Sequence, residues 1–153
     1  MKIRRYEIAD TAEIRQLFYD TIHAVNIRDY TPAQIAAWTA VNMDVALWSK
    51  SLSSKLTYVA EDEGKIIGFG ELETNGHIDR FYCHKDYQGQ GVGSKILAEI
   101  ELAARKLEIK KLFVEASITA KPFFAKRNFI VIKQQQVERR GEKLINFVME
   151  KIL

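Results

Sequence analysis

A glycine-rich turn between a strand pattern and a helix pattern constrains this chain more than any other segment. Residues 78–83 are typical of a β-strand, and Gly89, Gly91 and Gly93 follow them at alternate positions. A helical pattern begins next, with an apolar face made of Val92, Ile96, Leu97, Ile100 and Ala104. Glycine lets a backbone approach a ligand closely, and the first turn of a helix offers unpaired N–H groups and the positive end of the helix dipole. The segment therefore predicts a phosphate-binding loop.

The spacing of this turn argues against two common phosphate-binding loops. A Walker-type loop needs Gly-Lys followed by Ser or Thr, and the order Gly93-Ser94-Lys95 is different. A dinucleotide-binding loop needs Gly or Ala three residues after Gly91, where this chain has Ser94. A nucleotide-phosphate enzyme stays open as an alternative, although its lysine, magnesium-ligand and ribose signals are missing. An ordinary glycine-rich turn that caps a helix also stays open.

A different pattern, Gln-x-x-Gly-x-Gly, fits the loop at Gln88, Gly91 and Gly93. It resembles the pyrophosphate loop of the GNAT superfamily, the acetyl-CoA-dependent N-acetyltransferases. Residues 116–129 also resemble a block of that superfamily, Ala-Ser-x-x-Ala-x-x-Phe-Tyr-x-x-x-Gly-Phe. Two positions depart from the block, because Phe124 replaces the common Tyr and Asn128 replaces the common Gly. The second change is mild, since Asn readily adopts the left-handed conformation that ends a helix.

Length and composition are those of one folded domain. With 153 residues, of which 47% are hydrophobic and 28% charged, we expect a single N-acetyltransferase domain over residues 1–153. A net charge of +3 is too small to indicate nucleic-acid binding, and no apolar run is long enough to cross a membrane. One cysteine excludes an intrachain disulfide and indicates a cytoplasmic protein. The three histidines and one cysteine have no metal-ligand spacing, so no metal site is expected.

The remaining patterns alternate between strands and helices. Strands are expected over residues 2–8, 56–60, 66–73, 112–115, 130–137 and 144–149, besides the strand that ends at Cys83. Helices are expected over residues 11–25, 31–38, 44–48, 91–106 and 122–127. This order predicts an α/β fold, with a mixed sheet that carries helices on its faces. The resemblance implies a GNAT-like three-layer αβα arrangement with a splayed central mixed sheet.

The resemblance also implies acetyl-CoA as the cosubstrate. Backbone groups of residues 81–83 would pair with the pantetheine arm, and the N–H near Cys83 would face the acetyl carbonyl. The amides of residues 89–94 would bind the pyrophosphate. The cofactor-binding residues expected in this way are Phe81, Tyr82, Cys83, Gln88, Gly89, Gln90, Gly91, Val92, Gly93, Ser94, Ser117 and Phe124. Because the pantetheine needs space, the strands that end at Cys83 and Glu115 should splay apart.

Acetyl transfer from a thioester to an amine requires a base, because amines with a pKa of about 10 arrive protonated. Alternation counted back from Cys83 places Phe81, Asp79 and His77 on one strand face. His77 and Asp79 fall where members of the superfamily carry paired active-site histidines, and His77 falls where others carry a catalytic glutamate. We expect His77, which titrates near neutral pH, to be the base and Asp79 to orient water or the ammonium group. Glu71 and Glu73 are reserves, expected as surface charges.

The acid that protonates the leaving thiolate is not evident, because Phe124 has no hydroxyl group. Tyr82, Tyr58, Tyr30 or water could supply the proton, or the thiolate could leave unassisted, since thiols have a pKa of about 8.5. Cys83 is expected to be a buried structural residue rather than a nucleophile.

The favoured function is acetyl transfer to a primary amine by direct attack in a ternary complex. The acceptor would be a small molecule or a peptide, neither nucleic acid nor membrane would be a partner, and a homodimer is left open. The acceptor groove would lie between the first two helices and the last hairpin, with the aromatic residues Phe18, Tyr19, Tyr30, Trp38, Trp48 and Phe147. The alternative is a non-catalytic acetyl-CoA-binding sensor or regulatory module.

Overall fold

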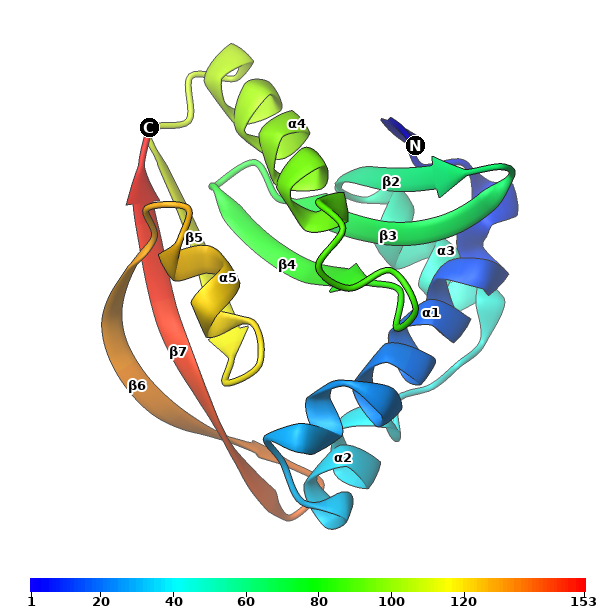
Figure 1. Ribbon diagram of the computed structural model, residues 1–153, viewed down its shortest axis with the longest axis vertical. Coiled ribbons are helices and arrows are strands. Elements are labelled where there is room, and N and C mark those ends of the chain that lie inside the picture. Colours follow the sequence, from blue (N-terminus) through cyan, green and yellow to red (C-terminus); the bar gives the residue numbers. More distant parts are fainter.

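The computed structural model describes residues 1–153 and shows one open, seven-stranded mixed sheet with five α-helices (Figure 1). The strands are β1 (Lys2–Arg5), β2 (Leu56–Asp62), β3 (Lys65–Leu72), β4 (His77–Cys83), β5 (Lys111–Ser117), β6 (Ile130–Arg139) and β7 (Glu142–Ile152). The helices are α1 (Thr11–Ala24), α2 (Pro32–Thr39), α3 (Val45–Ser53), α4 (Val92–Lys106) and α5 (Lys121–Ala125). None of these helices is long and apolar enough to span a lipid bilayer.

The sheet opens between its two central strands. The strand order is β1-β2-β3-β4-β5-β7-β6, and only β4 and β5 run parallel to each other. These two strands pair at His77–Phe113 and Ile78–Val114 and then diverge. The rest of β4 therefore lacks a backbone partner on its β5 side. The splayed sheet that the resemblance implies is confirmed.

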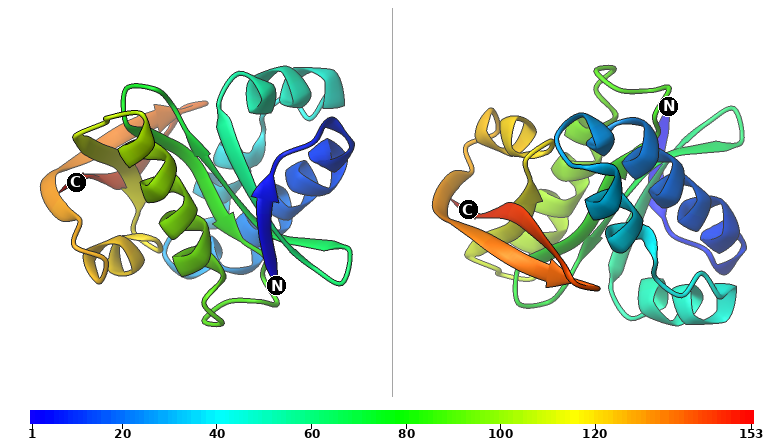
Figure 2. Two further views of the ribbon diagram at one scale, coloured as in Figure 1. Left: turned by 90° about the horizontal axis from the view of Figure 1, so that it is seen from above. Right: turned by 90° about the horizontal axis from the view of Figure 1, so that it is seen from below.

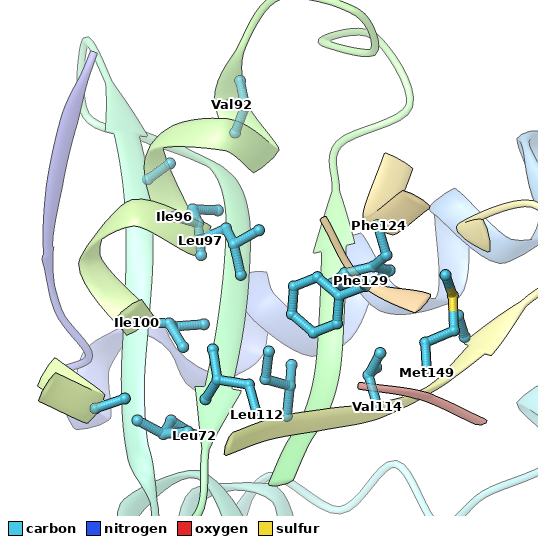
Figure 3. Packing of buried hydrophobic residues seen from close by; sticks show 14 of the residues in the cluster. Leu72, Val92, Ile96, Leu97, Ile100, Leu112, Val114, Phe124, Phe129 and Met149 are labelled. Atoms are coloured by element: carbon cyan, nitrogen blue, oxygen red, sulfur yellow. The ribbon is translucent and has the colours of Figure 1, made fainter. Parts of the chain in front are cut away.

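Helices cover both faces of the sheet and make three layers (Figure 2). The first core packs α4 and α5 against one face, and its central side chains include Leu72, Ile96, Leu97, Ile100, Leu112, Phe124 and Phe129 (Figure 3). The second core packs α1, α2 and α3 against the other face, and it includes Ile14, Phe18, Ile22, Ile35, Trp48, Leu52 and Phe69. The five apolar residues predicted for one face of α4 are all buried. Burial of each of the four larger side chains, which leaves out Ala104, stabilises the fold by about 2 kcal/mol. The three-layer αβα arrangement is confirmed.

Side chains cap the starts of α2 and α3, whereas the Asp10 side chain before α1 makes no capping hydrogen bond. The Gln34 amide donates to Thr31 Oγ1 over 3.1 Å, and the Leu47 amide donates to Asp44 Oδ1 over 3.1 Å. Asn128 adopts the left-handed conformation, with φ of 71°.

Several element ends differ from the expected ones. Helix α3 continues to Ser53, α5 ends early at Ala125, and the last hairpin pairs as far as Arg139 and Glu142. The outer residues of that hairpin are largely exposed, so no apolar alternation marks their pairing.

A β-bulge in β4 corrects the expected orientation of its side chains. Gly70 pairs with Phe81 and Leu72 pairs with Ile78, so two β4 residues lie opposite one residue of β3. A bulge adds one residue and reverses the alternation beyond it. Phe81 and Cys83 pack against the α4 core, whereas Asp79 reaches Lys55 beside α3. The prediction of a face shared with Cys83 is therefore confirmed for Phe81 and wrong for Asp79 and His77.

The Tyr30 hydroxyl holds the segment between α1 and α2 against the opened sheet. It donates to the Ile145 carbonyl over 2.6 Å and accepts from the Ile118 amide at 2.9 Å. We expect Tyr30→Phe to lower the free energy of unfolding by about 2 kcal/mol, because both backbone groups would lose their partner. Urea denaturation measures this loss. Tyr58→Phe is the matched control, since the Tyr58 hydroxyl has no partner within the protein and its ring lies beneath Arg5. Equal stability of the two variants would contradict the prediction.

Candidate active site

The glycine-rich turn presents a row of free backbone N–H groups at the start of α4. Gly91 is the residue before the helix and is left-handed, with φ of 82°. None of the six amides from Gly89 to Ser94 donates to an acceptor in the protein. Free amides at a helix start, together with the positive end of the helix dipole, bind anions such as phosphate. This geometry is that of the phosphate-binding loop expected from the sequence.

Neighbouring side chains hold the loop in place. The Gln88 side chain donates to the Cys83 carbonyl over 2.7 Å, which ties the loop to the end of β4. A Cβ atom at Gly93 would lie 2.7 Å from the Phe123 ring, so glycine lets α4 approach α5. The Arg127 guanidinium lies 3.8 Å from the centre of the Phe123 ring and donates to Ser94 Oγ. Arg127 thus places a cation beside the loop. Arg127 was not among the residues predicted from the sequence, although it lies within the 116–129 block.

A cavity of about 230 Å³, called here the loop cavity, runs from this loop into the gap between β4 and β5. Every cofactor-binding residue expected from the sequence lines it except Gln90, whose side chain donates to the Asp86 carbonyl. The half-buried Cys83 donates its thiol hydrogen to the Tyr87 carbonyl over 3.3 Å. Burial raises the pKa of Cys83 to about 11, which keeps the thiol neutral.

A second cavity of about 480 Å³, called here the hairpin cavity, lies between α2, the opened sheet and the β6–β7 hairpin. Of the six aromatic residues expected in an acceptor groove, Phe18, Tyr30 and Trp38 line it. The others pack elsewhere: Tyr19 stacks on His23, Trp48 is buried beneath Arg80, and Phe147 lies beneath Lys121.

The two cavities meet where β4 and β5 separate. Five residues line both of them and define what is called here the junction: Trp38, Asp79, Tyr82, Glu115 and Ser117. A ligand held in the loop cavity and a ligand held in the hairpin cavity would touch at this place. The junction therefore brings together two binding spaces and two carboxylates.

His77 lies beside the junction between two carboxylates. Its Nδ1 is 2.6 Å from Glu73 Oε1, and its Nε2 is 2.5 Å from Glu115 Oε2. Burial opposes the charged imidazolium, but the hydrogen bonds to both carboxylates outweigh it and raise the pKa of His77. The ring therefore accepts a proton strongly and is free to act as a base only above this raised pKa. Glu115, which connects His77 to the junction, was missed, although the sequence placed it at the end of the strand parallel to β4.

Asp79 is held at the junction by a buried network of charges. Glu71, which has no exposed surface, pairs with Arg80 at 2.7 Å and with Lys55 at 3.1 Å. Lys55 also pairs with Asp79 at 2.6 Å. Burial works against the Asp79 carboxylate, but the bond from Lys55 lowers the pKa of Asp79 overall. The expectation that Glu71 is a surface charge is wrong, and its carboxylate lies behind two cations, out of reach of a substrate.

The tyrosines named as proton donors differ in their access to the junction. The Tyr30 hydroxyl is occupied by two backbone groups, and Tyr58 lies on β2, away from both cavities. Tyr82 lines both cavities, and burial raises its pKa, so its hydroxyl stays protonated. Phe124 is buried among Phe81, Phe123 and Phe129.

The fold and the sequence match known acetyltransferases. Residues 26–151 match the family described as the acetyltransferase (GNAT) domain. The chain is 32% identical to the uncharacterized N-acetyltransferase YafP of Escherichia coli strain K12, over 97% of this chain and 94% of that protein. A GCN5-related N-acetyltransferase structure from Rhodopseudomonas palustris aligns with a TM-score of 0.95 and 34% identity, over 99% and 95% of the two chains.

A more distant structure shares the same fold. The PaiA N-acetyltransferase of Thermoplasma acidophilum, solved in complex with coenzyme A, aligns with a TM-score of 0.81 and 19% identity, over 99% of this chain and 98% of that one. Together with the free amides of the loop and the splayed sheet, the family match settles the class of the protein: the chain belongs to the GNAT family of acetyltransferases.

Proposed function

We propose that the protein transfers the acetyl group of acetyl-CoA to a primary amine by direct attack in a ternary complex. The single observation that carries this proposal is the meeting of the loop cavity and the hairpin cavity at one junction. Such a meeting lets a thioester and an amine react without a covalent enzyme intermediate. The high pKa of Cys83 also argues against an acyl-cysteine step. Residues 1–153 would act as one domain, in the cytoplasm.

The loop cavity would hold the cosubstrate. The pyrophosphate would bind the free amides of residues 89–94, with Arg127 as a nearby cation. The pantetheine would lie in the gap and pair with the unpaired edge of β4 at residues 81–83. It would satisfy backbone groups that otherwise need water. The thioester would then reach the junction, beside Ser117 and Tyr82.

A proton relay at the junction would prepare the amine. Asp79 and Glu115 attract the substrate ammonium, and Glu115 accepts its proton. Glu115 passes a proton from its other oxygen to neutral His77 at Nε2, while Glu73 holds Nδ1. The nitrogen lone pair then attacks the thioester carbon, the tetrahedral intermediate loses its second N–H proton to the Glu115 carboxylate, and the C–S bond breaks, so that coenzyme A leaves as a thiolate. The Tyr82 hydroxyl can donate a hydrogen bond to the sulfur.

The raised pKa of His77 has a consequence for the pH dependence of turnover. The fraction of His77 that is neutral, and so able to accept a proton, increases with pH. The kcat should therefore rise through the raised pKa of His77 and then level off. Glu73→Gln removes one of the carboxylates that raise this pKa and should move the rise in kcat to lower pH. Steady-state rates between pH 5 and 10 measure the shift. Glu63→Gln, in the β2–β3 turn, is the control and should leave the profile in place. An unchanged profile in Glu73→Gln would show that His77 does not set the rate.

The proposed function is tested by thiol release. Acetyl-CoA is incubated with the protein and a library of primary amines, and free coenzyme A is titrated with a thiol reagent. Amine-dependent release supports the enzyme. Coenzyme A binding without release from any amine would instead support the sensor or regulatory alternative. Preferential binding of ATP or NAD over coenzyme A would support a nucleotide-phosphate enzyme.

A further inference from the structure

The hairpin cavity has an acidic end at the junction. The carboxylates gathered there are Glu71, Glu73, Asp79 and Glu115, and the cations are Lys55, His77 and Arg80. Carboxylates thus outnumber cations by one even when His77 is charged. Asp79 and Glu115 are the two that line the cavity wall and remain partly exposed, at 39% and 42% of their side-chain surface. This end suits an ammonium group.

The opposite end of the same cavity is basic. Arg139 and Arg140 line it at the tip of the β6–β7 hairpin. Arg139 donates to the Glu138 carbonyl and Arg140 to the Ala37 carbonyl, and neither guanidinium pairs with a carboxylate. Glu142 lies opposite Arg139 in the strand register without forming an ion pair. Two arginines without a carboxylate partner are suited to bind an anion, because a guanidinium offers a planar fork of donors.

The hairpin tip is held in position by α2. Arg140 reaches the Ala37 carbonyl at 2.6 Å, and the Gln34 side chain donates to the Lys143 carbonyl over 2.8 Å. Figure 1 shows the tip of this hairpin beside α2, at the far end of β7 from the C-terminus. The basic end is therefore a fixed wall of the cavity rather than a free loop.

The strand register gives the distance between the two ends. Glu115 at the acidic end pairs with Val148, whereas Glu142, six residues away on β7, pairs with Arg139. Six residues of strand span about 20 Å. The lengths of the glutamate and arginine side chains shorten this distance, so an ammonium and an anion bound at the two ends would be about 10 Å apart. A simple α-amino acid is too short to use both ends.

The middle of the cavity contains an unused hydrogen-bond acceptor between aromatic walls. Asn146 Oδ1 is buried and has no partner. A buried polar atom without a partner destabilises the protein, and a bound donor would remove that cost. Tyr30 and Trp38, packed edge to face at 5.3 Å, line the same space. A ligand body here would offer an N–H to Asn146 and an apolar surface to the rings.

We propose that the acceptor is an elongated amino carboxylate with a peptide-like body, whose anionic group lies about 10 Å from the amine. The amine binds at Asp79 and Glu115, an N–H of the body donates to Asn146 Oδ1, and the carboxylate binds Arg139 and Arg140. An extended tripeptide has this length, since each residue spans about 3.5 Å. This inference rests on the proposed function, because it assigns the hairpin cavity to the acceptor.

The test compares two ligands that differ in one charge. The tripeptide Gly-Leu-Gly and its C-terminal amide are titrated by calorimetry into the protein saturated with coenzyme A. We expect the free acid to bind at least about tenfold more tightly than the amide. The double variant Arg139→Gln, Arg140→Gln should lose this preference. Arg105→Gln removes an exposed arginine of α4 outside both cavities and should keep the preference. Asn146→Leu should weaken the binding of both peptides by a similar factor.

Equal affinity for acid and amide overturns the inference, as does a preference that survives in the double variant or no binding of either peptide. Failure of the proposed function has a different signature, since it is judged by the absence of thiol release with every amine tested. A charge preference in binding that depends on the two arginines supports the inference whether or not transfer follows.

Discussion

Gly91→Val should abolish coenzyme A binding while the protein remains folded. Gly91 has φ of 82°, a conformation that costs a non-glycine residue about 1–2 kcal/mol and a β-branched residue more. Valine would relieve this strain by a rotation of the backbone at residue 91. The amides at the start of α4 would then no longer point together at the pyrophosphate. Each charge-assisted hydrogen bond contributes about 1.5–3 kcal/mol, so the loss of two weakens binding by more than about a hundredfold. Calorimetric titration with coenzyme A measures the effect.

Gly64→Val is a closely matched control for this variant. Gly64 has φ of 80°, and a Cβ atom would meet nothing within 4 Å at Gly64 or at Gly91. The two substitutions should therefore lower the melting temperature by similar amounts. Only Gly91→Val should weaken the binding of coenzyme A. If Gly91→Val is as stable as Gly64→Val and binds coenzyme A normally, the loop does not hold the pyrophosphate.

His77→Ala should lower kcat by about a hundredfold at neutral pH, the usual contribution of a general base. The substitution removes the group that receives the proton from Glu115. The loss should shrink as the pH rises, because free amine then forms without help. Rates of thiol release as a function of pH measure both effects. The coenzyme A affinity should stay unchanged, since His77 does not line the loop cavity.

His23→Ala is the control for the loss of an imidazole. His23 Nε2 lies 3.0 Å from Thr39 Oγ1 and His23 lines neither cavity, so its removal should leave kcat nearly unchanged. A different result would reassign the base. If His77→Ala keeps full activity at neutral pH while Asp79→Ala or Glu115→Ala is inactive, a carboxylate takes the proton without His77.

The parts of the site that depend on local sequence could be predicted. The loop at Gly89–Ser94 is defined by glycine spacing and by the start of an amphipathic helix, both of which are visible in the chain. The caps at Thr31 and Asp44 likewise depend only on residues close to them in the sequence. The gap between β4 and β5 was expected only through the resemblance to a family, since no local pattern encodes it.

The parts that depend on pairing between strands could not be predicted. The bulge at Asp79 and Arg80 arises from the register of β4 on β3, and it reverses the faces that simple alternation gives. The bridge from Glu73 through His77 to Glu115 needs the parallel register of β4 and β5, which places residues far apart in sequence side by side. Glu71 looked like a surface charge because its partners, Lys55 and Arg80, approach it only in the folded sheet.

The short pairing of β4 with β5 makes the sheet two half-sheets that share a narrow hinge. One half carries β1 to β4, the other carries β5, β7 and β6, and two residue pairs join their central strands. His77 sits at this hinge, bound to Glu73 in one half and to Glu115 in the other. Any opening of the hinge would separate His77 from Glu115 and lower the pKa of the imidazole. The pKa of His77 thus depends on the closure of the two halves. A cosubstrate that binds to both halves and holds them closed would keep this pKa raised.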